Sequence, residues 1–243
     1  MPEEAAVSRR NLAELDLAQG RIAAAITQAR AAEALFRERD DQRGQSDAGL
    51  LRVQALLAAR ADDDAARAFA ELAPVLKGAS TEQHAIAQLV AAEIAAHGGR
   101  PVLAATTLRN AAVLARRAGV RALQLEVALA QATPTGATDP SLESATATLG
   151  NASVRLQWLE LAMRRQLATG DRAGAAARYR EALGWLRAGD YAGADALHRL
   201  GASALDGTAA TIARERADAA HAAYRAALPN ELRGGFDRET AAR

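Results

Sequence analysis

The residues of this chain that could carry acid–base or metal chemistry are its four histidines and one run of aspartates. His84, His97, His198 and His221 are widely spaced, and no two stand at metal-ligand spacing with a carboxylate on a shared helix face. His84 and His97 are separated by about three and a half helical turns, so they do not converge. We therefore interpret the histidines as surface or groove residues, and we expect neither a metal ion nor another cofactor.

The aspartate run at residues 62–64 allows two interpretations, a divalent-cation site or the start of a helix. Consecutive residues on a helix do not share a face, and no EF-hand spacing follows the run. Carboxylates are favourable in the first turn of a helix, where they meet the positive end of its dipole. We prefer the second interpretation.

Motifs for nucleophilic or phosphate chemistry are absent from the sequence. Ser203 in GASALDG lacks the spacing of a nucleophile elbow, and no phosphate-binding glycine loop is present. The adjacent carboxylates Glu3–Glu4 and Asp40–Asp41 read as solvated surface pairs. We expect no enzymatic activity.

Composition favours an all-α fold. Aromatic residues make up 3% of the 243 residues, too few for an ordinary β-sandwich or barrel, while the helix formers Ala, Leu, Arg, Glu and Gln fill most of the chain. The 30 basic and 29 acidic residues balance, so no strong field attracts nucleic acid or an anionic membrane. Cysteine is absent, which excludes disulfides and thiolate chemistry. No signal peptide or membrane-spanning run is found, and we expect a cytoplasmic protein.

Turn residues divide the chain at intervals in the thirties to low forties, the period of repeats made from two helices. Ser80 with Gln83 forms the pattern of a capping box, and Asp139-Pro140 that of an N-cap followed by proline. The patterns predict helices near residues 3–18, 21–39, 44–60, 63–77, 81–97, 101–118, 120–132, 140–149, 152–168, 171–187, 191–205 and 208–227.

The stretch NLAELDLAQGRIAAAITQARAA resembles a tetratricopeptide repeat, in which small residues let two helices interlock around a turn glycine. The positions that match in the first repeat are Ala13, Gly20, Ala25 and Ala32, and those in the fifth are Gly170, Asp171, Ala175, Tyr179 and Ala182. The family's aromatic positions in the first helix are mostly Leu, Ala or Asp here, and repeats four and six match weakly. The resemblance implies a right-handed superhelical solenoid of about six antiparallel helix pairs.

The resemblance also implies a concave groove, lined by the first helix of each pair, that binds a protein or peptide. The groove positions carried over by register include Arg10, Asn11, Glu14, Arg52, Glu93, His97, Gln157, Glu160 and Arg164. The alternative is that these polar residues only solvate an exposed face. Trp158 and Trp185 are likewise either a partner's anchor pocket or packing between the fifth and sixth pairs, and we favour packing.

We expect repeats one to three and the first helix of pair four over residues 1–132, then an irregular turn and short helix over 133–150. Repeats five and six follow over 151–228, and residues 229–243 are expected to be a disordered tail. The uncapped first helix, with Ala5, Leu12 and Leu15, predicts either self-association through an end of the stack or a further domain that covers this end.

Three functions follow as hypotheses. The first is a scaffold for protein–protein interaction, with no binding of nucleic acid or membrane by this segment. The second is a sensory or regulatory segment, because the ending YRAALPNELRGGF looks like the close of tetratricopeptide regions at the C-terminus of larger bacterial regulators. The third, an RNA-binding helical repeat, conflicts with the near-neutral charge.

Overall fold

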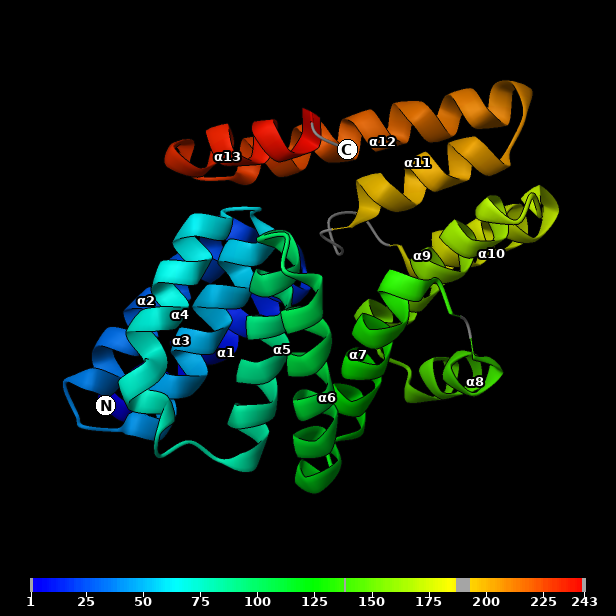
Figure 1. The fold of residues 1–243 in the computed structure, drawn as a ribbon. Helices are drawn as coiled ribbons and strands as arrows, with labels where there is room; N and C mark the ends of the chain where they lie inside the picture. The colour runs from blue at the N-terminus through cyan, green and yellow to red at the C-terminus, as the bar shows by residue number, and fades with distance from the viewer. Residues whose placement is uncertain (1, 138, 187–192, 242–243) are drawn as a thin grey trace. The chain divides into compact units, whose positions relative to one another are not determined.

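The computed structural model describes residues 2–137, 139–186 and 193–241, and over these residues the protein is helical with no strand (Figure 1). The chain divides into two compact units: unit 1 is Met1–Leu123 with Ala227–Arg243, and unit 2 is Gln124–Ala226. The predicted all-α class is confirmed, and the helices pack in adjacent pairs.

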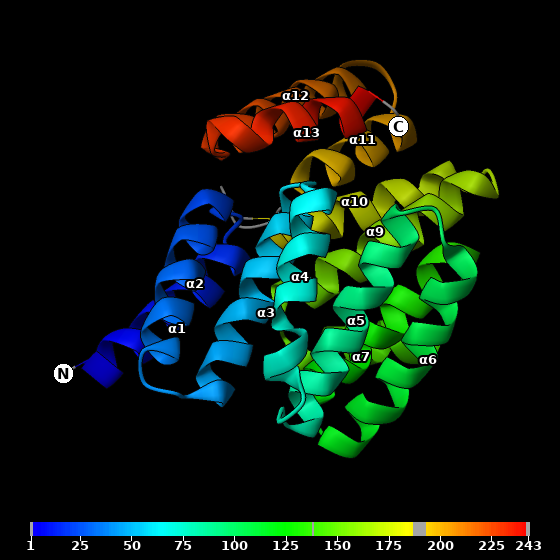
Figure 2. The same cartoon turned by 60° about the vertical axis from the view of Figure 1, so that its left-hand side comes forward.

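Unit 1 contains six helices of similar length followed, at the other end of the chain, by one more. They are α1 (Pro2–Ala18), α2 (Ile22–Arg37), α3 (Gln42–Ala58), α4 (Asp62–Leu76), α5 (Thr81–His97), α6 (Pro101–Ala118) and α13 (Asn230–Ala241). Successive helices from α1 to α6 lie side by side in both views (Figure 2). The alternate helices α1, α3 and α5 also contact one another, α1 with α3 and α3 with α5.

Small residues allow this close approach. Ala6, Ala32 and Ala48 are fully buried where α1, α2 and α3 meet, and Phe36 packs with them. Gly44 on α3 lies under the Phe36 ring so closely that a Cβ there would be 2.3 Å from a ring carbon. The regularly spaced alanines of these helices therefore mark the positions where the helices contact one another.

Unit 2 contains the rest of the helices, with its core around α9. They are α7 (Arg121–Ala132, whose first three residues belong to unit 1), the 3₁₀ turn η1 (Thr133–Thr135), α8 (Pro140–Leu149), α9 (Ala152–Ala168), α10 (Arg172–Trp185), α11 (Ala194–Ala204) and α12 (Gly207–Ala227, whose last residue belongs to unit 1). Leu156, Leu159 and Met163 of α9 are at most 1% exposed, and Leu197 of α11 and Ala213 of α12 belong to the same cluster. In unit 2, α9 contacts both α10 and α11.

The expected helix ends are those of the structure to within two residues wherever both are described. Ser80 accepts from the Gln83 backbone N–H at 3.2 Å while the Gln83 side chain accepts from the Ser80 N–H at 2.8 Å, so the capping box is present. Asp139 caps α8, accepting from the Ser141 N–H at 2.8 Å. The end expected at residue 187 and the start expected at residue 191 lie outside the described residues.

The C-terminal segment corrects one expectation. Residues expected to form a disordered tail instead form α13, from Asn230 to Ala241. Its buried side chains continue from Leu228 at a spacing of four through Leu232 and Phe236, which are 2%, 8% and 2% exposed. The Arg60 guanidinium carbon lies 5.3 Å from the centre of the Phe236 ring. This apolar stripe, the spacing of a helix face, outweighs the polar and glycine content that suggested disorder.

Candidate functional site

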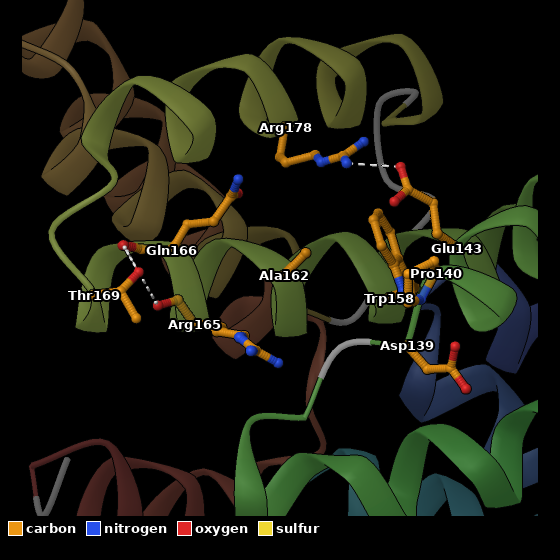
Figure 3. Close-up of a pocket in the computed structure, with 9 residues that line it drawn as sticks. All are labelled: Asp139, Pro140, Glu143, Trp158, Ala162, Arg165, Gln166, Thr169 and Arg178. Atoms are coloured by element: carbon orange, nitrogen blue, oxygen red, sulfur yellow. Dashed lines mark hydrogen bonds and ion pairs between the residues drawn. The ribbon is translucent and has the colours of Figure 1, made fainter.

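The candidate site of unit 2 is built on one face of α9. The helix begins after Asn151, whose side chain accepts from the Val154 N–H at 3.1 Å. Trp158, Ala162, Arg165 and Thr169 recur at intervals of three and four residues, so they line one face of α9. Gln166 of α9, the N-terminus of α8 and the middle of α10 supply the other side chains of the site (Figure 3).

A buried arginine joins the three helices. Arg155 of α9 is only 4% exposed, and its Nε donates to Glu181 of α10 at 2.9 Å. Its Nη1 donates to the Glu143 carbonyl at 2.9 Å and to the Thr146 hydroxyl at 3.1 Å, both on α8. The guanidinium therefore has partners on α8 and α10, which is the condition for holding a charge away from water.

Two guanidinium groups lie against the Trp158 ring. The Arg155 Cζ is 4.5 Å and the Arg178 Cζ 4.8 Å from the ring centre, both within cation–π range. Arg178 in turn pairs with Glu143 at 2.6 Å and with Glu181 at 3.3 Å. Two arginines and two glutamates thus surround the indole, with balanced formal charge.

Trp158 itself is 2% exposed, and its indole Nε1–H has no hydrogen-bond acceptor among the residues that the structure describes. A buried donor without an acceptor costs free energy, so such a group is unusual in a settled core. Trp158 belongs to the core cluster and also lines the pocket described next. The packing interpretation of Trp158 therefore agrees with the structure, and its role as an anchor for a partner stays a prediction.

A pocket of about 150 Å³ opens beside the Trp158 ring. Its lining consists of Asp139, Pro140, Glu143, Trp158, Ala162, Arg165, Gln166, Thr169 and Arg178 (Figure 3). Hydrogen bonds from Ser141 lower the pKa of Asp139, which favours its ionised form. Arg165 is exposed, and its guanidinium donates to the Gly136 carbonyl at 3.4 Å.

Gln166 adds a second polar group to this pocket. Its Nε2 donates to Asp171 at 3.1 Å, while its Oε1 is buried and has no donor within the described part of the chain. The pocket therefore offers charged groups of both signs and, within its lining residues, one donor and one acceptor that have no partner. A neutral polar or zwitterionic group fits these requirements better than a multiply charged anion.

A separate polar network lies on α10, α11 and α12. The Tyr179 hydroxyl is 2.7 Å from His198 Nδ1, and Asp195 lies 3.5 Å from His221 Nδ1. Burial lowers the pKa of His198, and the positive charge of Arg216 acts in the same direction while Asp195 opposes it. Burial also raises the pKa of Tyr179, partly offset by Arg216. His198 is therefore held in its neutral form more strongly than an exposed histidine.

The structure groups three of the expected groove residues on α1. The Arg10 guanidinium donates to Asn11 at 3.1 Å and to Glu14 at 3.0 Å, and lies 4.0 Å from Asp47 of α3. Because α1 and α3 are both first helices of a pair, this cluster lies along the row that the resemblance assigned to the groove.

Arg52 is placed differently. Its guanidinium pairs with Glu33 of α2 at 3.0 Å and with Glu71 of α4 at 3.2 Å. Both partners lie on second helices, so Arg52 points away from the row of first helices and is largely covered, with 12% of its side chain exposed. Register fixes a sequence position and not the direction of a side chain, so the groove role of Arg52 stays a prediction.

Glu93 and His97 lie one turn apart on α5, and His97 Nδ1 is 2.9 Å from Asp62 at the start of α4. The aspartate run thus occupies the first turn of α4, and one member also holds a histidine. Over the described part of the chain, no group of three or more His, Cys, Asp or Glu residues is arranged to hold a metal ion.

Gln157, Glu160 and Arg164 lie on a face of α9 turned away from the pocket. Glu160 and Arg164 form an ion pair one turn apart, at 2.6 Å. Arg165 and Trp158 do line the pocket. The sequence does not place Arg165 among the expected binding residues, and it favours a packing role for Trp158. Sequence reasoning also missed Arg155, since nothing in its neighbourhood distinguishes it from a surface arginine.

No family model, curated protein or solved structure matches this chain. Within the described residues, no helix has both the length and the apolar character needed to cross a membrane.

Proposed function

We propose that this protein is a scaffold that binds a peptide or protein, built as a tetratricopeptide-like array of helix pairs. The contacts between alternate helices, α1 with α3 and α3 with α5, and α9 with α11, support it. Stacked helix pairs in a solenoid make such contacts, because each first helix packs on that of the next pair. The right-handed superhelix, and a groove along the first helices, are part of this proposal.

The observation that carries the proposal furthest is the pocket beside Trp158. Pockets for drug-sized ligands and cofactors usually measure about 300–1,000 Å³. At about 150 Å³ the pocket has room for one side chain of a partner and not for a large cofactor. An aromatic wall with a few polar groups is a common anchor site in protein interfaces.

The polar lining indicates how such a side chain is held. Arg165 and Asp139 lie on the exposed side of the pocket, while Trp158 and Arg178 form its inner wall. A partner side chain that accepts a hydrogen bond would satisfy the Trp158 Nε1–H, after a small shift of the groups that cover it. Asn, Gln or a backbone peptide group meets this requirement without disturbing the balanced arginine and glutamate pairs.

Two neighbouring arginines on α9 allow a matched test. Arg165 lines the pocket, whereas Arg164 pairs with Glu160 on the groove face that the resemblance implies. Peptides would be selected from a displayed random library against the wild-type chain, and their binding measured by fluorescence anisotropy. The variants Arg165→Glu and Arg164→Glu change the same charge at adjacent exposed positions.

Loss of binding in Arg165→Glu with binding retained in Arg164→Glu would support the pocket as the binding site. The reverse result would support the groove along the first helices and remove the pocket from the proposal. If selection yields no peptide that binds the wild-type chain, the scaffold function itself is refuted. Far-UV circular dichroism of each variant checks that the helices remain folded.

A further inference from the structure

The mouth of the pocket beside Trp158 carries two charged side chains of opposite sign. Asp139 and Arg165 both line the pocket and are exposed, whereas Trp158 in its inner wall is 2% exposed. In Figure 3 Asp139 and Arg165 are drawn below α9, and Arg178 of α10 above it. Neither Asp139 nor Arg165 forms an ion pair in the part of the chain that the structure describes, so both charges are available to a ligand.

The two charges are close enough for one small molecule to meet both. The Arg165 guanidinium donates to the Gly136 carbonyl at 3.4 Å. Gly136 precedes Asp139 by three residues, so at most about 11 Å of extended chain separates them. Such a separation suits an α-amino acid, whose ammonium and carboxylate are attached to one carbon and can pair with Asp139 and Arg165 at once.

Asp139 is positioned and ionised without a ligand. It caps α8 by accepting from the Ser141 N–H at 2.8 Å, and hydrogen bonds from Ser141 lower its pKa. A carboxylate has about four acceptor sites, so the bonds from Ser141 leave others for an ammonium group. The mouth of the pocket therefore presents a fixed negative charge opposite the Arg165 guanidinium.

The inner wall favours a neutral ligand side chain that accepts a hydrogen bond. Arg178 pairs with Glu143 at 2.6 Å, so a charged side chain would enter the pocket without a counter-charge. Two guanidinium groups already lie within 4.8 Å of the centre of the Trp158 ring, which leaves little of the ring for stacking. What Trp158 still offers is its Nε1–H, which is buried and has no acceptor among the described residues.

A carboxamide side chain meets these requirements. It carries no net charge, and its oxygen accepts from the Trp158 Nε1–H after the small shift of the covering groups described above. Gln166 lies eight residues further along α9, about 12 Å along the helix axis, so its buried Oε1 is too distant for the same carboxamide. We infer that the pocket binds a free α-amino acid with a carboxamide side chain, glutamine or asparagine, with the charged end at the mouth and the amide at Trp158.

This inference rests on the pocket of the proposed function, but it requires no partner protein. At about 150 Å³ the pocket has room for one side chain inside its mouth, so a free amino acid and the anchor side chain of a partner exclude one another. The amino acid therefore regulates the scaffold by releasing a partner from the pocket. A titration without any peptide tests the ligand separately from the scaffold.

The test is a titration of the wild-type chain with L-glutamine and with L-asparagine, followed by NMR of the indole N–H groups of its two tryptophans. The variant Trp185→Phe identifies the Trp158 signal. For a ligand of about ten non-hydrogen atoms a Kd of about 1 mM is expected, so the titration extends to about 20 mM. N-acetyl-L-glutamine lacks the ammonium group, and L-glutamine amide lacks the carboxylate.

Two variants remove the charges at the mouth, and each has a matched control. Asp139→Asn keeps a side chain that can cap α8, and its control is Asp41→Asn at the N-cap of α3. Arg165→Gln is compared with Arg164→Gln, the same change at the neighbouring arginine, which does not line the pocket. Circular dichroism melts establish that every variant is folded.

We expect glutamine or asparagine to shift the Trp158 indole signal, because its N–H gains an acceptor, and to leave the Trp185 signal in place. The Kd of the ligand that binds rises at least about fivefold in Asp139→Asn and in Arg165→Gln, and stays unchanged in the two controls. N-acetyl-L-glutamine loses no affinity for Asp139→Asn, because it has no ammonium to pair with the aspartate. L-glutamine amide likewise loses none for Arg165→Gln.

The inference is overturned if neither amino acid shifts the Trp158 signal, or if both mouth variants bind as the wild type does. Equal binding of N-acetyl-L-glutamine amide, which lacks both charges, would also overturn it and show that the pocket takes a residue within a peptide. A selected peptide that requires Arg165 and that glutamine and asparagine fail to displace refutes the inference and leaves the scaffold standing. Binding of the amino acid when no peptide can be selected supports the inference and refutes the scaffold.

Discussion

The ion pair between the buried Arg155 and Glu181 allows a specific prediction about the stability of unit 2. Removing Glu181 and removing Arg155 should have unequal effects on the free energy of unfolding. Glu181→Ala leaves the Arg155 guanidinium, whose side chain is 5% exposed, without its main counter-charge. Arg155→Met instead removes the buried charge and keeps a side chain of similar length. Glu181 then still pairs with Arg178 at 3.3 Å, and the Glu143 carbonyl still accepts from the Thr146 hydroxyl at 3.0 Å.

The magnitude follows from burial. Removing one partner of a fully buried ion pair costs about 3–5 kcal/mol. The Glu181 side chain is 32% exposed, so water partly screens the charge. Arg155 also keeps its contacts with the Glu143 carbonyl, the Thr146 hydroxyl and the Trp158 ring. We therefore expect Glu181→Ala to lower the free energy of unfolding of unit 2 by about 2 kcal/mol, and Arg155→Met to change it by less than about 1 kcal/mol.

Urea unfolding followed by tryptophan fluorescence measures this selectively, because both tryptophans, Trp158 and Trp185, belong to unit 2. With a slope of about 1–3 kcal/mol/M, a loss of about 2 kcal/mol moves the midpoint by roughly 1 M. Arg164→Ala is the control, since its exposed one-turn pair with Glu160 is worth about 0.5 kcal/mol or less. If Arg155→Met proves as costly as Glu181→Ala, or if Glu181→Ala is no worse than the control, the desolvation argument is wrong.

Three further predictions concern packing, protonation and capping. Gly44→Ala should destabilise unit 1 by about 1–3 kcal/mol in circular dichroism melts because its Cβ would meet the Phe36 ring, while Gly184→Ala, where the space is open, should be neutral or stabilising by up to about 1 kcal/mol. His198 has a lowered pKa in the folded state, so unit 2 should have its full stability at pH values above the unfolded pKa of 6.5 and lose part of it as the pH falls below that value. In His198→Gln this part of the pH dependence of the urea midpoint should vanish. If it persists, another group is responsible. Ser80→Ala should cost unit 1 about 1 kcal/mol in the same melts, and no measurable loss would mean that the capping box contributes nothing.

The helices could be predicted from the sequence because their ends are marked by local chemistry. Ser80 with Gln83, and Asp139 before Pro140, act within one turn of chain and need no distant partner. The small residues of α1, α2 and α3 likewise repeat at helical spacing. Such signals survive in a single sequence because they depend on neighbours along the chain.

The site could not be predicted in the same way. Arg155 is buried only because Glu143, Thr146 and Glu181 arrive from two other helices, and nothing local marks it. Register assigns Arg52 to the groove, whereas its ion pairs with Glu33 of α2 and Glu71 of α4 direct its guanidinium toward the second helices. Leu228, Leu232 and Phe236 did carry a readable helical spacing, which the glycines and charges around them obscured.

Unit 1 is made of two segments from opposite ends of the chain, so the order of synthesis affects how it folds. Its last helix, α13, follows the whole of unit 2 in the chain, yet Phe236 of α13 lies against Arg60. A nascent chain therefore completes all of unit 2 before it can finish unit 1. The entropy of closing so long a loop grows only slowly with its length, so the delay costs time more than stability. During translation, unit 1 therefore lacks its contacts with α13 until unit 2 has been synthesised. Docking of α13 is the step that completes the folding of unit 1.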